Sequence, residues 1–410
     1  MIHNRLGRNF AVQKVESTLH LLNEISSIEF PHDDATRALN ELKNILEDVL
    51  TDLQAALGAP PTSGILRSQQ LRAVDSVIEA LDLAGLVANS ANIRNAFEGH
   101  GPLLEIARKL IGPHTYLILS FQWEWMPFTY PQTSILTDCV IIGLPASEAS
   151  NALVLPAVGH ELGHSLWRSQ DLASAFQTEI RDDIIKKITS KLFWSAFLKL
   201  YPDARKKTLG DMVNQISWKP SFNWAMRQIE EIFCDFVGLY VFGSSYLDCL
   251  AYLLSPVFSE GRTCTYPSMR QRAEFLVEAT QYLGISVQPR FVDQFDLEKM
   301  QNLSDRDRLL LQIADSVVCD LSAKIRIEAF KLCNNGIGAF GNDNSGTLKE
   351  SFERNIPGGE ANNLRSILVA GWDTFKGETF MNSDTDTSRT SSLNELIFKT
   401  MEISELNRTP

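Results

Sequence analysis

The feature that most constrains this chain of 410 residues is a pair of histidines four positions apart in an apolar segment. His160 and His164 lie in the run Pro156-Ala-Val-Gly-His160-Glu161-Leu-Gly-His164-Ser-Leu-Trp167, which has the pattern His-Glu-x-x-His. In an α-helix, residues four apart lie one turn apart on the same face. The spacing therefore predicts a helix that directs both imidazoles toward one metal ion. Glu161 would follow about 100° further round, beside the open coordination position.

The surroundings of the motif favour a metal site over two incidental histidines. The predicted helix is otherwise apolar, and Gly163 within it costs helix stability relative to alanine. Such a glycine indicates the close approach of another backbone. Zinc is the expected metal, because imidazole suits this ion and a catalytic site needs three protein ligands and one water.

Elimination narrows the identity of the third ligand. The chain has no histidine after His164, and the positions at which a third-histidine variant of the motif would continue hold Trp167 and Gln170. We therefore expect a carboxylate from a later helix, which would complete a site of two histidines and one glutamate. Glu231 is the best candidate, and Glu230 is the fallback.

A second acidic residue accompanies Glu231 on the helix predicted over 222–242. Asp235 follows it by four positions, and the neighbouring residues are mostly apolar. A carboxylate pair on such a helix is costly unless it is paired or coordinated. We expect Glu231 to bind the metal and Asp235 to accept the far N–H of a ligand histidine. The alternative is that Glu230 and Glu231 only cap the solvated edge of a core helix.

Together the two motifs resemble those of the gluzincin zinc metallopeptidases, in which the third ligand comes from a Glu-x-x-x-Asp helix. The resemblance is closest to the heat-shock membrane peptidases and the prenyl-processing peptidases, which have Ala or Ser where this chain has Cys234. The run from Tyr266-Pro to Arg272 is similar to their His-Pro-x-x-x-x-Arg segment, with Tyr266 in place of the histidine. The resemblance covers about residues 135–280, and it implies a zincin-like fold and zinc-dependent peptide hydrolysis.

The residues and the resemblance imply the same chemistry. Zinc lowers the pKa of a bound water to about 7, and Glu161 is expected to accept a proton from that water and deliver it to the leaving amine. The tetrahedral oxyanion also needs a hydrogen-bond donor. Since no downstream histidine exists, Tyr266, Arg270 or Arg272 is expected to supply it, with Tyr266 as our choice. A plain Tyr-Pro turn before a basic helix start is the alternative.

The sequence predicts an α+β, predominantly helical fold in three parts. Residues 1–112 form a helical N-terminal region, 113–290 a zincin-like metallopeptidase core with a small sheet, and 291–410 a helical C-terminal region. Segments 115–125 and 139–143 are rich in β-formers and predict strands. Either 115–122 or 139–143 could be a sheet edge that binds substrate as an added strand.

Two local patterns in the first 130 residues support specific expectations. Leucines and a valine recur at spacings of three and four from 39 to 57, which predicts a helix that begins at Asp33 or Asp34 and ends at Gly58. Aromatic residues crowd segment 121–130, where we expect strand packing in a core in preference to a substrate cleft.

Composition limits the partners. The net charge of −12 argues against nucleic acid and against an anionic membrane surface. The apolar stretch 232–258 is interrupted by acidic residues and a glycine, so we expect a buried helix and no membrane span. The six cysteines contain no C-x-x-C pair and the N-terminus has no apolar signal segment, so we expect reduced thiols and a cytoplasmic location.

These observations predict a cytoplasmic zinc peptidase that acts on a peptide or protein substrate. The flanking helical regions are expected to cover the cleft or to bind a protein partner. Three alternatives stay open: a non-catalytic regulatory or scaffold protein that keeps a zincin-like fold, a metal-free helical interaction module, and a membrane-associated peptidase.

Overall fold

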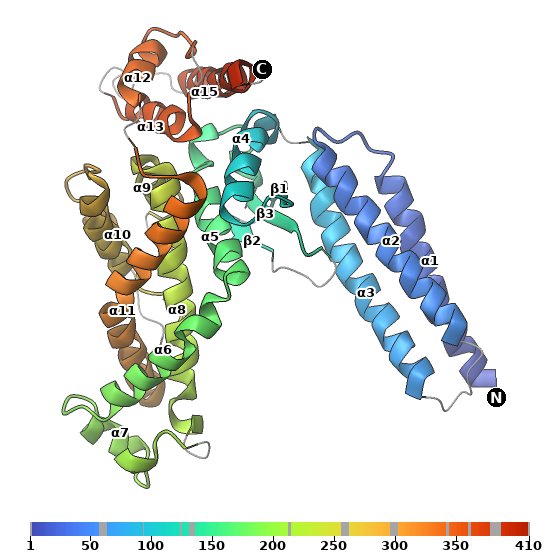
Figure 1. The fold of residues 1–410 in the computed structure, drawn as a ribbon, viewed down its shortest axis with the longest axis vertical. Coiled ribbons are helices and arrows are strands. Elements are labelled where there is room, and N and C mark those ends of the chain that lie inside the picture. Colours follow the sequence, from blue (N-terminus) through green and yellow to red (C-terminus); the bar gives the residue numbers. More distant parts are fainter. Residues whose placement is uncertain are drawn as a thin grey trace. The chain divides into compact units, whose positions relative to one another are not determined.

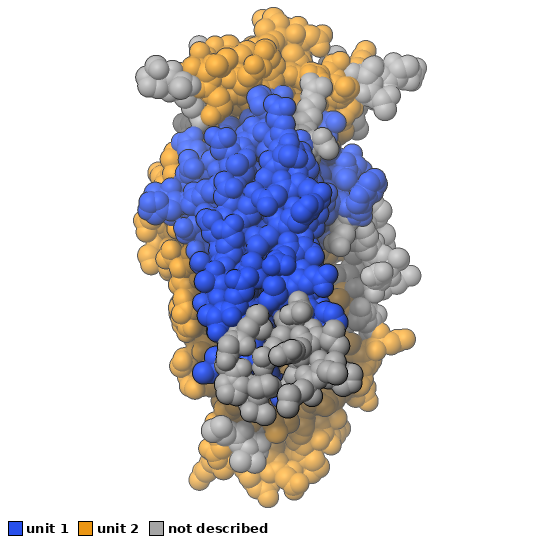
Figure 2. All heavy atoms as spheres, turned by 90° about the vertical axis from the view of Figure 1, so that its right-hand side faces the viewer, with its two compact units in different colours: residues 1–108, 112–150 blue, residues 109–111, 151–410 orange. Residues whose placement is uncertain are grey.

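A computed structural model of the chain divides into two compact units, which Figure 2 distinguishes. Unit 1 comprises residues 1–108 and 112–150, and unit 2 comprises 109–111 and 151–410. The structure describes residues 2–56, 64–92, 94–123, 125–130, 136–211, 215–255, 262–295, 302–341, 344–359, 362–377 and 387–408. The predominantly helical α+β character is confirmed, since helices dominate these ranges and one small sheet is present.

Unit 1 begins with three helices that pack against one another (Figure 1). The elements in this part of the chain are α1 (Ile2–Ile25), α2 (Asp33–Ala56), α3 (Gly64–Asn89), the short 3-10 helix η1 (Ser90–Asn92) and α4 (Arg94–Leu110). In α2 the predicted stripe is buried from Leu39 to Leu53, and Asp33 and Asp34 occupy the first turn of the helix. The helix therefore begins where the sequence predicts. The predicted end at Gly58 lies outside the described residues.

The sheet of unit 1 has the strand order β1-β3-β2. Strand β1 (Tyr116–Gln122) runs parallel to β3 (Cys139–Pro145), and β2 (Phe128–Thr129) pairs with β3 antiparallel. Both predicted strand segments are confirmed. Within the described residues β3 lies between the other two strands, so the expectation that 139–143 could be a sheet edge is wrong.

Helices of unit 1 hold the sheet by hydrogen bonds as well as by apolar packing. The carboxylate of Asp34 accepts from the backbone N–H of Leu117 at 2.9 Å, and the Ser120 hydroxyl donates to the carbonyl of Leu86 at 2.8 Å. Tyr116 and its neighbours join the same apolar core as the helices. The sheet thus belongs to the unit of the N-terminal helices, and neither predicted boundary, at 112 or 290, coincides with this division.

The aromatic segment after β1 does not pack as expected. Phe121 is buried, but Trp123 is 98% exposed and Trp125 is 39% exposed. The expectation of core packing for the whole segment is therefore wrong. Strand β1 ends at Gln122 and β2 begins at Phe128, so Trp123 and Trp125 lie outside the sheet and lose the partners that would bury them.

Unit 2 is built around α8 (Gln215–Phe242), against which α5 (Ala157–Ser169), α6 (Leu172–Ile188), α10 (Met269–Leu283) and α11 (Asp305–Ile337) pack (Figure 1). Its other described helices are η3 (Ala152–Val154), α7 (Trp194–Leu200), η4 (Lys206–Thr208), α9 (Ser244–Leu254), η6 (Val292–Phe295), α12 (Ser345–Glu353), α13 (Leu364–Phe375) and α15 (Thr387–Arg408).

The apolar stretch 232–258 contains the end of α8 and all of α9. The two helices are separate because Gly243 adopts a left-handed φ of +63°, a conformation that favours glycine. Among the helices in the described ranges, none combines the length and the apolar character needed to cross a bilayer.

Candidate metal centre

Two glycines on α5 bring the His-Glu-x-x-His segment against α8. A Cβ at Gly163 would lie 2.7 Å from the Cα of Cys234, and a Cβ at Gly159 would lie 2.9 Å from the Cα of Gly238. Any larger residue would push the two backbones apart. The close approach expected from Gly163 is therefore confirmed, and it brings the carboxylates of α8 within reach of the histidines of α5.

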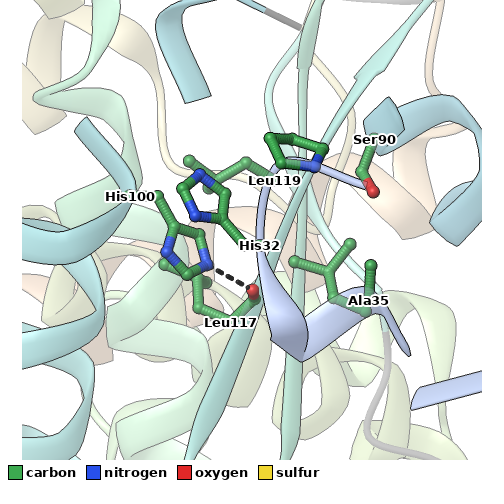
Figure 3. Close-up of a pocket in the computed structure, with 8 residues that line it drawn as sticks. His32, Ala35, Ser90, His100, Leu117 and Leu119 are labelled. Atoms are coloured by element: carbon green, nitrogen blue, oxygen red, sulfur yellow. Dashed lines mark hydrogen bonds between the residues drawn. The ribbon is translucent and has the colours of Figure 1, made fainter. Parts of the chain in front are cut away.

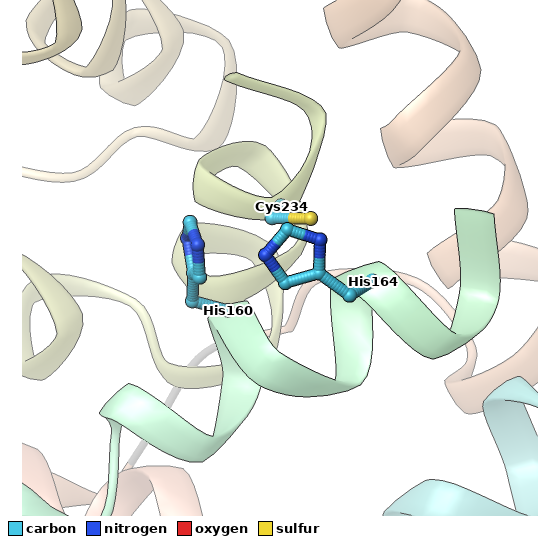
Figure 4. Close-up of side chains that lie close together, drawn as sticks. All are labelled: His160, His164 and Cys234. Carbon is cyan, nitrogen blue, oxygen red and sulfur yellow. The ribbon is translucent and has the colours of Figure 1, made fainter. Parts of the chain in front are cut away.

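His160 and His164 lie one turn apart on α5, and both rings are directed toward α8 (Figure 4). Their ring centroids are 5.1 Å apart, with the planes at 80°. Both side chains are mostly buried, with 12% and 16% of their surface exposed. The helical spacing predicted from the sequence thus places the two imidazoles side by side.

Each histidine has its own carboxylate at Nδ1. His160 Nδ1 lies 3.0 Å from Asp235 Oδ1, and His164 Nδ1 lies 2.9 Å from Glu230 Oε1. When Nδ1 donates to a carboxylate, the neutral ring keeps a lone pair on Nε2. The two carboxylates therefore favour the tautomer in which Nε2 of each histidine can bind a metal.

The Nε2 atoms both face Glu231. Glu231 Oε2 lies 3.4 Å from His160 Nε2, and Glu231 Oε1 lies 3.7 Å from His164 Nε2. Burial alone would raise the pKa of Glu231, but hydrogen bonding and charge from His160 outweigh this and hold the pKa below its usual value. Each imidazole thus has its Nε2 atom close to one oxygen of the ionised Glu231.

Asp235 is fixed by three further hydrogen bonds. Arg272 donates from Nε to Oδ2 at 2.8 Å and from Nη2 to Oδ1 at 2.7 Å, and the Tyr246 hydroxyl donates to Oδ1 at 2.6 Å. Burial would raise the pKa of Asp235, but Arg272 and His160 together lower it well below its usual range. The carboxylate that orients His160 is therefore ionised and held rigidly.

His160 itself is influenced by the same acids. Burial lowers its pKa, whereas its hydrogen bonds to Asp235 and Glu231 raise it, and the net shift is upward. Without a metal, the ring therefore favours a proton between the two carboxylates. A metal ion would replace that proton, because only a neutral imidazole can be a ligand.

Tyr266 and Glu161 lie close to this centre. The negative charge of Glu231 is the largest contribution that raises the pKa of Tyr266, followed by burial, and Glu161 contributes in the same direction. The carbonyl of Tyr266 accepts from Arg262 Nε at 2.9 Å, and Arg262 in turn forms a double hydrogen bond with Asp315. The backbone at Tyr266 is thereby attached to α11. Glu161 is 5% exposed.

The other two oxyanion candidates have different partners. Arg270 Nε donates to Glu274 at 3.0 Å on an exposed face of α10. Arg272 is buried and engaged with Asp235. Of the three side chains considered, Tyr266 is the one that is 48% exposed beside the metal centre.

Cys234 offers a second donor set. Nitrogen atoms of His160 and His164 and the sulfur of Cys234 lie within 4.8 Å of one another (Figure 4). Burial and the surrounding carboxylates raise the pKa of the Cys234 thiol well above its usual value, so the thiol keeps its proton. Among the described residues, the group of mutually close donor atoms is therefore the two histidines with Cys234, while Glu231 lies beside the Nε2 atom of each histidine. We favour Glu231, because it faces the Nε2 atoms and is already ionised.

Sequence reasoning missed several partners of the centre. It assigned Glu230 only as a fallback ligand, whereas the structure places this carboxylate on Nδ1 of His164. It assigned no role to Tyr246, and it treated Arg272 only as an oxyanion donor. Adjacency to Glu231 could have suggested Glu230, but the other two contacts join different helices and have no signal in the local pattern.

The described part of unit 1 contains a small cavity, which Figure 3 shows beside the stacked rings of His32 and His100. His100 Nε2 donates to the carbonyl of Leu117 at 2.9 Å. The cavity has a volume of about 10 Å³, which is room for about one water molecule. It is too small for a substrate.

Comparison of the chain with protein-family models, with curated protein sequences and with solved structures finds no match. The chemistry of the centre therefore follows from its own donor atoms, distances and charges.

Proposed function

We propose that the chain is a zinc-dependent peptidase with a zincin-like catalytic centre in unit 2. His160, His164 and Glu231 would hold the metal, and Glu161 would be the general base. The observation that carries this proposal is the convergence of both Nε2 atoms on the two oxygens of Glu231 while each Nδ1 is bonded to a separate carboxylate. All six cysteines lie in described parts of the chain and none is in a disulfide, which supports a cytoplasmic location.

Bound zinc would lower the pKa of a coordinated water to about 7 and polarise the carbonyl of the scissile peptide bond. Glu161 follows His160 directly on α5 and accepts a proton from the attacking water. It then delivers that proton to the amine that leaves. Asp235 and Glu230 keep the imidazoles in the ligand tautomer throughout.

Tyr266 is the proposed donor to the oxyanion. Its pKa is raised by Glu231, so the phenol keeps its proton near neutral pH and can donate a hydrogen bond. Its partial exposure leaves it accessible to a substrate. This role rests on the position of Tyr266 beside Glu231, and it is independent of the family pattern, which has histidine there.

A second candidate is a non-catalytic regulatory or scaffold protein that retains the metal. The observation in its favour is the position of Cys234. If the thiolate joined the two histidines and Glu231, four protein ligands would close the coordination sphere, which is typical of structural zinc sites. Such a site would leave no position for a reactive water.

Elemental analysis and hydrolysis assays on purified protein distinguish these proposals. We expect about one equivalent of zinc in the wild type and hydrolysis of members of an unbiased peptide library. Glu161→Gln should keep the zinc and lose about 10²- to 10⁴-fold in rate, and Glu231→Gln should lose the zinc. Glu328→Gln, which removes a partly exposed acid that pairs with Lys331 on α11, is the matched control.

Each failure has a distinct meaning. Full activity in Glu161→Gln would rule out the hydrolase. If Glu231→Gln keeps its zinc and Cys234→Ala loses it, the metal is bound by the two histidines and Cys234. If the wild type keeps its zinc but hydrolyses no peptide, the scaffold protein is favoured. A protein that takes up no zinc even when the metal is added would be a helical interaction module.

A further inference from the structure

Arg168 is a cation on the histidine face of α5 that neither the ligand set nor the proposed mechanism uses. It follows His164 by four residues and Glu161 by seven, so the helical period places it on the same side of α5, about one turn beyond the second histidine. Its side chain is mostly buried. The charges of Glu230 and Glu161 act on its guanidinium, which places Arg168 near the metal centre.

The hydrogen-bonding capacity of Arg168 is largely unmet. Its Nε is buried and has no hydrogen-bond partner, and its Nη2 makes one long contact of 3.4 Å with the hydroxyl of Ser165. No carboxylate among the described residues forms an ion pair with it. A buried donor without a partner costs about 1–3 kcal/mol, and more when it is charged. An acceptor that bonded to the guanidinium of Arg168 would remove this cost.

The acids around Arg168 do not supply the missing hydrogen-bond partner. Burial lowers the pKa of Arg168, and the charges of Glu230 and Glu161 oppose that shift from a distance. Glu230 has its own partners, since it accepts from His164 Nδ1 at 2.9 Å and from Arg227 Nη1 at 3.1 Å. The negative charge of Glu230 is thereby largely balanced, and Arg168 keeps a partly dehydrated positive charge at the edge of the centre.

We propose that Arg168 is a specificity residue that binds a carboxylate of the peptide substrate. A guanidinium presents a planar fork of donors that matches a carboxylate with two parallel hydrogen bonds, which a water molecule cannot do. The carboxylate is either an acidic side chain near the scissile bond or the free C-terminus of the peptide. This inference rests on the proposed peptidase function and adds the class of substrate.

The test uses the full-length, zinc-loaded protein and peptides that its wild type cleaves in the unbiased library. Each peptide is made with Glu or Gln at every position near the cleaved bond, and with a free or an amidated C-terminus. We expect the carboxylate form to be favoured by about 10- to 100-fold in kcat/KM. The Glu and Gln pairs identify a side-chain carboxylate, and the acid and amide pairs identify the C-terminus.

Variants then assign the preference to Arg168. Arg168→Gln should lose the preference, keep its zinc, and cleave the neutral peptides within about threefold of the wild-type rate. Arg168→Lys should keep part of the preference, because a point charge remains but the fork is lost. Arg181→Gln, which removes an exposed arginine paired with Asp182 on α6, is the matched control and should behave as wild type.

Failures of the two proposals are distinguishable. If the wild type hydrolyses no peptide, the proposed function fails. If it hydrolyses peptides without regard to the carboxylate, or if Arg168→Gln keeps the preference, the role of Arg168 is overturned while the peptidase stands. A loss of zinc in Arg168→Gln would also overturn it, because Arg168 would then only balance Glu230. If Arg168→Gln does not fold, the peptide series on the wild type and Arg168→Lys still decide.

Discussion

At the scale of single residues, the centre is a set of acids with separate tasks. Glu231 faces the Nε2 atoms, while Asp235 and Glu230 each bond one Nδ1. Three carboxylates within six positions of one helix would repel one another in isolation. Here the two histidines, Arg272 and Arg227 balance them, so the cluster is stable only as a whole.

Removal of the charge of either Glu230 or Asp235 should lower the affinity for zinc more than it lowers the stability of the fold. We expect Glu230→Gln and Asp235→Asn each to reduce zinc affinity by about 10- to 100-fold, because the amide no longer fixes the ligand tautomer with a full charge. Competition with a chromophoric chelator measures this affinity. Glu328→Gln should leave it unchanged, and wild-type affinity in both site variants would contradict the assignment.

A second residue-scale prediction concerns Asp34 in unit 1. Burial would raise the pKa of Asp34, but hydrogen bonds from His100 and from the N–H of Leu117 lower it below 3.8. The ionised form is therefore better stabilised in the folded protein. Its contribution is present above the ordinary pKa of the group and is lost as the pH falls through the lower, folded value.

Asp34→Asn should therefore destabilise the protein by about 1–3 kcal/mol near neutral pH. The difference from wild type should shrink as the pH falls below the ordinary pKa of an aspartate. Urea unfolding at several pH values measures it. Asp52→Asn removes a half-exposed acid paired with Arg72, and it should cost less than about 1 kcal/mol. A difference that does not depend on pH would show that Asp34 acts through shape and not through charge.

At the scale of elements, the contact between α5 and α8 determines whether the centre exists. A Cβ at Gly163 would lie 2.7 Å from the Cα of Cys234, which is backbone and cannot swing away. Gly163→Ala should therefore destabilise unit 2 by about 1–3 kcal/mol, although alanine is the better helix former by about 1 kcal/mol. Thermal or urea unfolding measures the change, and zinc affinity should fall with it.

Gly85→Ala is the matched control for this prediction. Gly85 lies inside α3, and nothing approaches within 4 Å of the position its Cβ would occupy. The same substitution should there stabilise the protein by about 0.4–1 kcal/mol. If Gly163→Ala were equally stabilising, the close packing of α5 on α8 would be contradicted.

The elements also show what the sequence could and could not predict. Helical spacing relates residues of one helix, so the pairing of His160 with His164 and of Glu231 with Asp235 could be read directly. The contacts of Asp235 with Tyr246 and Arg272 join three helices, and no local period encodes them. The exposure of Trp123 could not be predicted either, because it depends on where strand β1 ends.

At the scale of the whole molecule, each unit has an apolar core of its own, and every residue assigned to the metal centre belongs to unit 2. The sheet belongs instead to unit 1. The sequence could not predict this division, because segments that follow one another along the chain do not reveal which core they join. Strand β1 lies at an edge of the described sheet, so substrate binding along segment 115–122 stays a prediction.

A core substitution in unit 1 should leave the metal centre intact. Leu42 is fully buried in α2, and Leu42→Ala should cost unit 1 about 2–5 kcal/mol. The native protein should still bind zinc with wild-type affinity. Urea unfolding followed by circular dichroism, together with chelator competition, measures both quantities. A fall in zinc affinity at urea-free conditions would show that the units depend on each other.

The left-handed turn at Gly243 has a consequence for how the centre tolerates change. The turn folds α9 back so that the ring of Tyr246 lies over Gly238, where a Cβ would come within 2.5 Å of a ring carbon. Both glycines are thus needed to bring the phenol of Tyr246 onto Asp235. A larger residue at either position would displace Tyr246 from Asp235. Asp235 would then hold the ring of His160 less firmly, although no proposed metal ligand had been changed.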